Sequence, residues 1–425
     1  MTGHTDAVRA RSRRLARSSG VTSAVAAALL FLPLAAGAQS GGDHLRVWLV
    51  TAAPGDQVWE RYGHNALRVL DTQTGRDVSY NWGIFDFQQV DFIPRFLRGE
   101  MLYTMAAFDT EAMLASYRRA NREVVLQELA FTSAQKLRLV ELAETNLRPE
   151  NAAYIYQYFL DNCSTRIRDL LDTVLDGALQ LQFTPQPSGT TYRDNTRRLT
   201  QVDPLIYTGM DLALGTPTDA EISVWEQMFL PMTLRDEARA FRVVSATGGS
   251  IPFVLDEQVV VPSTRAADPT EPPRWLWLYL GLGIAVGVLF GSLATSAVRD
   301  RAAVHRAIST LAVLWSALGG VLGLILVGLL FTDHTFAYWN ENLFLVHPLL
   351  LVPAIALPVS YFRPGWARVA SRAALLAAAL GLVGLVVQLA PQAHHQNGIF
   401  FALLLPAHLG LAYGLLNPPG RTKAR

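Results

Sequence analysis

The 425-residue sequence contains a single cysteine, Cys163. One cysteine cannot form a disulfide within the chain, so a disulfide-stabilised fold is excluded and a free thiol has to be explained. The sequence also lacks a glycine-rich phosphate loop, a Cys/His zinc pattern and a basic stripe interleaved with aromatic residues. We therefore expect no nucleic-acid partner, no cofactor and no metal site.

Charge is missing from long stretches of the C-terminal third. Five segments of about 20 residues, the length needed to cross a bilayer core, contain no Lys, Arg, Asp or Glu: 276–298, 307–332, 343–362, 373–393 and 398–416. The sequence predicts an all-α bundle of five transmembrane helices at 275–418, after a proline-rich linker at 261–274 and before a cytoplasmic tail at 419–425.

The few basic residues around these segments indicate their orientation. The loops after the second and fourth segments have no Lys or Arg. Basic residues follow the other three: Arg299, Arg301 and Arg306; Arg363, Arg368 and Arg372; Arg421, Lys423 and Arg425. Basic loops stay in the cytoplasm, so the chain before residue 276 is expected outside it.

The N-terminus independently predicts export. Five arginines between Arg9 and Arg17 precede an apolar run at 21–36, and Ala36-Gly37-Ala38 has the small-x-small form of a cleavage site. This pattern is typical of a signal peptide at 1–38, with Gln39 as the first mature residue. An uncleaved membrane anchor is the alternative.

Residues 43–260 are long enough for one domain with a sizeable core. Runs typical of strands alternate with a helix that opens on a capping box at Thr132 and Gln135, which predicts an α+β fold. We expect strands at 44–52, 62–70, 78–87 and 123–131, a turn at 71–75 and the helix at 132–147.

Cys163 lies in Asp161-Asn162-Cys163-Ser164-Thr165, directly before a helix-like run. Asn162, Ser164 and Thr165 are helix-capping types, so the sulfur is expected at a helix N-terminus. The helix dipole and free backbone N–H groups at that position favour thiolate over thiol. The alternative is a small buried hydrophobic residue, the usual state of an inert cysteine.

His64 is the natural general base for such a thiol. The only other histidine of this domain, His44, is close to the new N-terminus. We expect Asn81, on the neighbouring strand, to orient the imidazole. Backbone N–H groups near Cys163, with Asn162 and Ser164, are expected to form the oxyanion hole or its surroundings. A structural, hydrogen-bonded histidine is the alternative for His64.

The sequence resembles the Lnb-type bacterial lipoprotein N-acyltransferases, which combine a periplasmic domain with five membrane helices. The resemblance depends on motifs in both parts of the chain: Tyr62-Gly63-His64, Tyr80 to Phe87, Asp161 to Arg166, Met228 to Pro231, Asp333-His334, Asn340-x-Asn342 and His347-Pro348.

The resemblance implies a permuted papain-like fold related to NlpC/P60 peptidases, with His64 and Cys163 as the catalytic pair. It also implies transfer of an acyl chain from a phospholipid to the N-terminal amine of a diacylated lipoprotein. The protein would then lie in the lipid bilayer of the bacterial inner membrane, with its N-terminal domain in the periplasm. Two other functions remain open: a membrane-tethered thiol hydrolase of cell-wall or lipid-linked substrates, and a non-enzymatic envelope scaffold.

Polar residues in the outward loops are candidate binding residues for lipid headgroups or the acceptor amine: Asp333, His334, Asn340, Asn342 and His395. The alternative is a set of solvated polar loops. A metal site at His334, His394 and His395 lacks a recognisable ligand spacing. His347 and His408, inside apolar spans, fit either a functional role or hydrogen bonding between helices.

Overall fold

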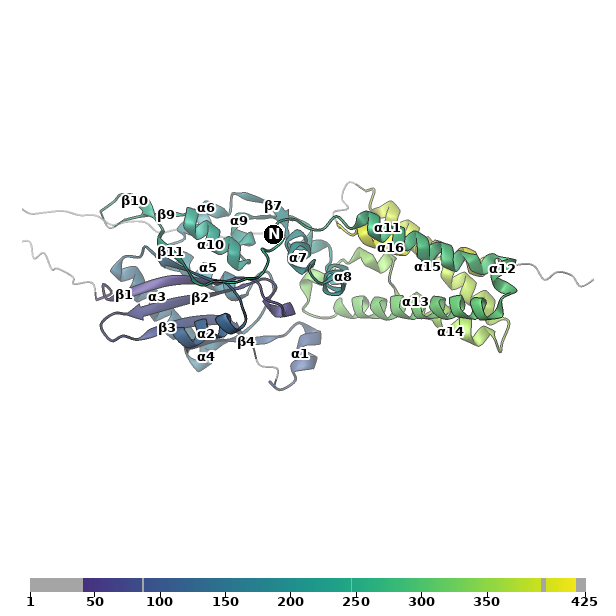
Figure 1. The fold of residues 1–425 in the computed structure, drawn as a ribbon, viewed down its shortest axis with the longest axis horizontal. Helices are drawn as coiled ribbons and strands as arrows, with labels where there is room; N and C mark the ends of the chain where they lie inside the picture. Colours follow the sequence, from purple (N-terminus) through teal and green to yellow (C-terminus); the bar gives the residue numbers. More distant parts are fainter. Residues whose placement is uncertain (1–40, 86–87, 246, 391–394, 418–425) are drawn as a thin grey trace, which may run out of the picture. The chain divides into compact units, whose positions relative to one another are not determined.

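The computed structural model describes residues 41–85, 88–245, 247–390 and 395–417. The expected signal peptide and cytoplasmic tail lie outside these residues, as do Asp86, Phe87 and His394. The described chain has an α+β part with a large sheet, followed by five helices long and apolar enough to cross a membrane (Figure 1), as the sequence predicted.

A seven-stranded antiparallel sheet forms the framework of the α+β part, in the order β11-β5-β1-β2-β3-β4-β6. The four predicted strands correspond to β1, β2, β3 and β5, with ends shifted by up to three residues. The strands of the sheet are β1 (Leu45–Ala52), β2 (His64–Asp71), β3 (Asp77–Ile84), β4 (Leu102–Asp109), β5 (Val124–Leu129), β6 (Ala153–Ile155) and β11 (Val254–Val261).

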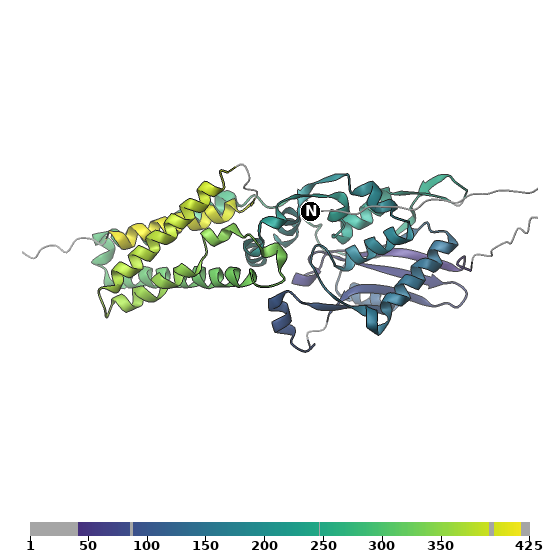
Figure 2. The ribbon, with the colours of Figure 1, turned by 180° about the vertical axis from the view of Figure 1, so that it is seen from behind.

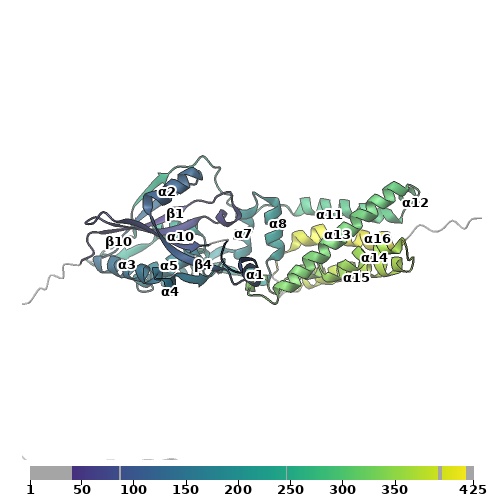
Figure 3. The ribbon, with the colours of Figure 1, turned by 90° about the horizontal axis from the view of Figure 1, so that it is seen from below.

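Helices cover both faces of this sheet. α3 (Ser133–Leu147) and α5 (Cys163–Val174) pack on one face, and α2 (Thr110–Arg119) packs on the other (Figures 2 and 3). The central strand β1 is therefore buried almost throughout, which explains why it reads as a nearly continuous apolar run. α3 begins with the predicted capping box, in which Thr132 and Gln135 bond each other's backbone.

Shorter elements complete the α+β part. Among them α1 and α8 contact the membrane part, as described below. Their bounds are η1 (Val58–Glu60), α1 (Phe92–Arg98), α4 (Pro149–Ala152), α6 (Ala178–Phe183), β7 (Pro187–Thr191), α7 (Tyr192–Thr200), α8 (Pro204–Ala213), η2 (Thr216–Thr218), β8 (Glu221–Ser223), α9 (Val224–Gln227), α10 (Pro231–Ala240), β9 (Arg242–Val244) and β10 (Ser250–Pro252).

The proline-rich segment after β11 is held against the α+β part by hydrogen bonds. Arg265 forms a paired ion bridge with Asp56, with both N–O distances at 2.6 Å. Arg198 donates to the carbonyl of Pro269 at 3.0 Å. The proline-rich segment is therefore bound along the surface of the α+β part.

The five apolar helical segments run Leu276–Ala294, Ala302–Leu329, Glu341–Ser360, Trp366–Val387 and Gly398–Leu416. They comprise α11 (Leu276–Gly291), η3 (Ser292–Ala294), α13 (Ala302–Leu329), η5 (Glu341–Phe344), η6 (Pro348–Leu350), α14 (Leu351–Ser360), α15 (Trp366–Val387) and α16 (Gly398–Leu416), with α12 (Ser296–Arg299) and η4 (Thr335–Ala337) in the connections.

Three of these segments begin earlier than the charge-free runs predicted: the third by two residues, at Glu341, and the second and fourth by more. α13 starts at Ala302 and α15 at Trp366, so they include Arg306 in one case and Arg368 and Arg372 in the other. Arginine is tolerated in the first turns of these helices because its long side chain can extend to the polar interface. The helices therefore begin before their apolar stretches do.

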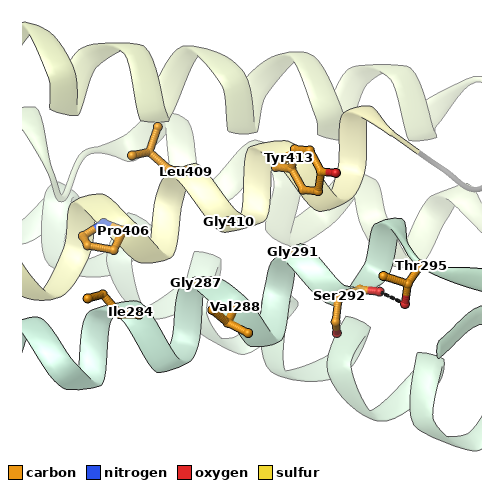
Figure 4. A pocket seen from close by; sticks show the side chains of 10 residues that line it. All are labelled: Ile284, Gly287, Val288, Gly291, Ser292, Thr295, Pro406, Leu409, Gly410 and Tyr413. Atoms are coloured by element: carbon orange, nitrogen blue, oxygen red, sulfur yellow. Dashed lines mark hydrogen bonds between the residues drawn. The ribbon is translucent and has the colours of Figure 1, made fainter. Parts of the chain in front are cut away.

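Helices α11 and α16 approach each other through glycine. A side chain on Gly410 would place its first carbon 2.0 Å from the carbonyl oxygen of Gly287, so neither position tolerates one. Beside this contact lies an open apolar groove of about 580 Å³, bordered by Ile284, Leu409 and Tyr413 (Figure 4). The groove lies within the membrane part and includes none of the candidate site residues.

Candidate active site

Cys163 is the first residue of α5, and Asn162 caps that helix. The Asn162 side-chain oxygen accepts hydrogen bonds from the backbone N–H groups of Ser164 at 2.8 Å and Thr165 at 2.9 Å. The Thr165 hydroxyl in turn accepts from the Asn162 N–H at 2.7 Å. This reciprocal cap places the thiol at the positive end of the helix dipole, where a thiolate is favoured.

The cap is hydrogen-bonded to the segment just before α10. The Asn162 amide donates to the carbonyls of Tyr158 and Phe229, both at 2.9 Å, and the Ser164 hydroxyl donates to the carbonyl of Met228 at 2.6 Å. Both amide protons of Asn162 are thus used, so its side chain has no free donor for an oxyanion. Asn162 and Ser164 therefore position Cys163, and their backbone N–H groups already donate within the cap, that of Asn162 to Thr165 and that of Ser164 to Asn162.

His64 is brought to the thiol by the start of β2. The preceding Gly63 has a φ of +80°, and a side chain there would place its first carbon 2.8 Å from the carbonyl oxygen of Ala52. Only glycine fits this approach without strain. The His64 imidazole then lies close enough to the Cys163 thiol for each group to shift the pKa of the other, although 99 positions separate the two residues in the sequence.

Asn81 orients the imidazole from the neighbouring strand β3. Its side-chain oxygen lies 3.0 Å from His64 Nε2, while its amide donates to the Ser79 carbonyl at 3.0 Å and faces the Met113 sulfur at 3.5 Å. This orientation of the amide makes Nε2 the protonated nitrogen and leaves Nδ1 free to accept a proton from the thiol. Cys163, His64 and Asn81 therefore lie together in one site.

The surroundings of this pair favour charge separation. Burial alone would raise the pKa of the Cys163 thiol, but the facing His64 and the N–H groups of Asn65 and Ser164 lower it below its ordinary value. Burial likewise opposes protonation of His64, yet the Cys163 sulfur and Asn81 raise the pKa of its imidazole. The lowered pKa of the Cys163 thiol and the raised pKa of the His64 imidazole together favour a thiolate–imidazolium pair.

Two residues that sequence reasoning missed lie beside the sulfur. Gly83 has a φ of +87° at an irregularity of β3, and a side chain there would come within 3.4 Å of the Cys163 Cβ. The Tyr154 hydroxyl is buried close to Gly83 and has no hydrogen-bond partner among the described residues. The alternating tyrosines at 154, 156 and 158 are the sequence signal that could have pointed here.

Two of the predicted loop residues lie against the α+β part. The N–H of Asp333 donates to the carbonyl of Arg98 at 2.7 Å, and the Asp333 residue itself is exposed. His334 Nε2 lies 2.8 Å from the carbonyl oxygen of Phe96, and its ring is stacked on Tyr158. His334 thus connects the loop after the second span with the segment that leads to Cys163.

Asn340, Asn342 and His395, predicted as binding residues with solvated loops as the alternative, are buried. The amides of both asparagines donate to the carbonyl of Leu212 at the end of α8, at 2.8 and 3.0 Å. His395 Nδ1 accepts from the N–H of Glu341 at 3.1 Å. The two asparagines therefore link the membrane part to α8, whereas His395 bonds within the membrane part. All three buried side chains are poorly placed to meet a solvated headgroup.

An ion cluster completes this junction. The Arg193 guanidinium is fully buried and pairs with Asp211 at 2.8 Å and Asp219 at 2.6 Å. Arg197 also pairs with Asp211, at 2.9 Å, and donates to the carbonyl of Gln396 just before α16. The junction therefore combines buried charges with backbone hydrogen bonds.

His347 and His408 are also buried. Both ring nitrogens of His347 and Nδ1 of His408 have no hydrogen-bond partner among the described residues. The hydrogen bonds between helices that were one expectation for these nitrogens are therefore not formed within the part of the chain that the structure describes.

One of the comparisons with known proteins found a match, and it covers the part of the chain that contains Cys163 and His64. No curated protein and no solved structure matches the chain. Residues 36–198 match the family model described as the Lnb N-terminal periplasmic domain, a range that includes His64, Asn81, Tyr154 and Cys163. This match confirms the resemblance that the motifs indicated, and it is consistent with the Lnb-type family for this chain.

Proposed function

We propose that this protein is a membrane-bound acyltransferase with a cysteine nucleophile, located in the bacterial inner membrane with its α+β domain in the periplasm. It would transfer an acyl chain from a phospholipid, through a Cys163 thioester, to the N-terminal amine of a diacylated lipoprotein. One observation carries the proposal: a capped thiol faces an imidazole that Asn81 orients, in a domain attached to five apolar helices.

In the first half-reaction the Cys163 thiolate attacks the ester carbonyl of the lipid. The carbon–sulfur bond forms, the carbonyl oxygen becomes an oxyanion, and collapse of this intermediate breaks the carbon–oxygen bond. The imidazolium of His64 gives its proton to the departing alcohol. The products are a Cys163 thioester and a lysolipid.

In the second half-reaction the amine of the acceptor attacks the thioester. His64, now neutral, takes a proton from the amine, and the carbon–sulfur bond breaks as the amide forms. The thiolate returns to its starting state beside the imidazolium. The sum of both steps moves one acyl group from oxygen to nitrogen and consumes no further reactant.

Donors for the oxyanion are available next to the sulfur. The Asn65 N–H faces the thiol, and the Ser164 N–H faces it while also donating to Asn162. The Tyr154 hydroxyl, buried beside Gly83, has no acceptor for its proton among the described residues. We assign Tyr154 the role of hydrogen-bond donor to the tetrahedral intermediate, because a buried hydroxyl without a partner is costly unless a ligand oxygen completes it.

A test with the full-length protein separates the transferase from a hydrolase. Purified protein in vesicles receives phospholipid with a labelled acyl chain and a synthetic diacylated lipopeptide with a free N-terminus. The proposal predicts label in amide linkage on the lipopeptide, and loss of this product in Cys163→Ser, because a hydroxyl beside the same base ionises far less readily. Release of free fatty acid alone, or cleavage of a wall peptide by the same thiol, would favour the hydrolase.

A further inference from the structure

The short helix α1 presents an apolar face that nothing in the described structure covers. Ile93 and Leu97, about one helical turn apart, are each 61% exposed, and Val90, in the turn before the helix, is 84% exposed. Phe96 on the same helix and Leu102 at the start of β4 are also exposed. Soluble proteins seldom leave so many neighbouring large apolar side chains in water, and such a patch marks an interaction surface.

Contacts with the loop after the second span determine where this face lies. The carbonyl of Arg98, the last residue of α1, accepts from the N–H of Asp333 at 2.7 Å, and the carbonyl of Phe96 accepts from His334 at 2.8 Å. Gly99 has a φ of +79°, and a side chain there would come within 2.8 Å of the Asp333 backbone. The close approach of α1 to this loop therefore requires glycine.

The same contacts place α1 at the edge of the bilayer. The second span ends at Leu329, only four residues before Asp333, and the intervening Phe331 is 85% exposed. Phe331 thus extends the apolar surface of the span toward the loop that contacts α1 at Asp333 and His334. A segment of this kind, apolar on one face and attached at the end of a transmembrane helix, fits the boundary between headgroups and acyl chains.

We propose that α1 inserts the face formed by Val90, Ile93 and Leu97 into the outward-facing leaflet, beside the second span. The surface would bind the acyl region of bilayer lipids, and this inference does not depend on the thiol chemistry proposed above. It commits to lipid as the occupant because α1 is hydrogen-bonded to the loop that directly follows a helix long and apolar enough to cross a membrane.

A row of aromatic rings links this surface to the thiol. Phe96 contacts His334 with ring centroids 6.3 Å apart, His334 stacks on Tyr158 at 6.2 Å, and Tyr158 contacts Tyr156 at 6.2 Å. The Tyr156 ring reaches within 3.6 Å of the space beside Gly83, where Cys163 lies. This row of ring contacts connects α1 with the surroundings of Cys163.

Depth-dependent fluorescence quenching tests the insertion. Replacement of Cys163 by alanine removes the only cysteine, so Ile93→Cys and Leu97→Cys can each carry one bimane label in the full-length protein. Leu181→Cys on α6, 80% exposed in the parent, is the matched control. All three positions are mostly exposed, so the labels leave the core packing unchanged.

The labelled proteins are placed in phosphatidylcholine–phosphatidylglycerol vesicles with or without brominated acyl chains. Insertion predicts that bromine quenches the labels at 93 and 97 at least about threefold more than the label at 181, and that aqueous iodide gives the opposite order. Equal iodide quenching at all three positions would overturn the proposal. Protection at 93 and 97 from both quenchers would also overturn it, since a protein partner would then cover the face.

Discussion

The reactivity of Cys163 depends on a balance between burial and its immediate neighbours. Burial disfavours a thiolate, whereas His64 and two backbone N–H groups favour it and prevail. Because the stabilising groups act only on the charged sulfur, removal of the imidazole leaves the burial penalty with less opposition. The thiol should then behave as a buried, inert cysteine.

The pH dependence of alkylation tests this balance. In the native protein, iodoacetamide should modify Cys163 with a midpoint below about 8.5, the ordinary pKa of a cysteine thiol. His64→Ala should move the midpoint to higher pH, because the pKa of Cys163 rises when its charged partner is lost. His44→Ala, which removes the domain's other described histidine, should leave the midpoint in place. An unchanged midpoint in His64→Ala would contradict the pairing.

Asn81 is expected to act through His64 and not on the substrate. Asn81→Ala leaves Nε2 of a buried imidazole without a partner, which costs about 1–3 kcal/mol, equivalent to roughly a tenfold to hundredfold loss of kcat. The KM for lipid should stay nearly constant, and Asn81→Asp, which retains an acceptor oxygen, should recover part of the rate. Full activity of Asn81→Ala in steady-state assays would rule out this positioning role.

Sequence reasoning found these three residues but not their neighbours. With one cysteine in the chain and two histidines in the domain, few pairs were possible, and the hairpin that pairs Ala66 with Asn81 places Asn81 near His64. Tyr154 and Gly83 meet Cys163 only through β6, β4 and β3. No local pattern encodes such a long-range arrangement.

Among the elements, β3 contains the irregularity that makes room for the nucleophile. Its pairing with β4 shifts between Asn81 and Ile84, and Gly83 adopts a positive φ within this shift. A bulge of this kind redirects the strand and re-aims the side chains around it. Gly75, in the turn before β3, has a similar φ of +76° but open space around it.

The two glycines therefore form a matched pair for substitution. Gly83→Ala and Gly75→Ala should each destabilise the protein by about 1–2 kcal/mol through backbone strain. Only Gly83→Ala adds a carbon beside Cys163 and Tyr156, and it should lower acyl transfer about tenfold or more, because both the added carbon and the backbone strain then lie next to the nucleophile. Both variants are assayed as full-length protein of verified fold. If their rates of acyl transfer are equal, the space beside Gly83 plays no part in the reaction.

Elements with strong local signals were predictable, and edge strands were not. α3 follows from its capping box and β1 from its apolar run. β11 was not predicted, because most of its residues are exposed and it pairs only with β5, so its sequence lacks the alternation typical of a half-buried strand.

In the whole molecule, a buried polar junction connects the two parts of the chain. Arg193 offsets the charges of Asp211 and Asp219 at the centre of this junction. Asn340, Asn342 and His395 read as loop residues in the sequence, since they flank apolar spans. Their burial depends on contact with α8 and α7, which lie more than 120 residues earlier in the chain.

Loss of Arg193 should therefore affect the whole protein. Arg193→Ala leaves the buried carboxylate of Asp219 without its ion-pair partner and Asp211 with Arg197 alone, and it should cost about 3–5 kcal/mol of unfolding free energy. Arg138→Ala breaks an exposed pair with Asp176 and should cost at most about 1 kcal/mol. Thermal unfolding of the full-length protein in detergent measures both. Similar melting temperatures for the two variants would show that the junction contributes little to stability.

Intact-protein mass spectrometry of Cys163 tests the central claim most directly. Purified protein is incubated with phospholipid and no acceptor, then analysed whole and after digestion. The proposed mechanism predicts the mass of one acyl chain on the peptide containing Cys163, removed by hydroxylamine and discharged by an amine-bearing lipopeptide, and no adduct in Cys163→Ala. Transfer of label to the lipopeptide by Cys163→Ala, or an acyl group on any residue other than Cys163 in the native protein, would contradict it.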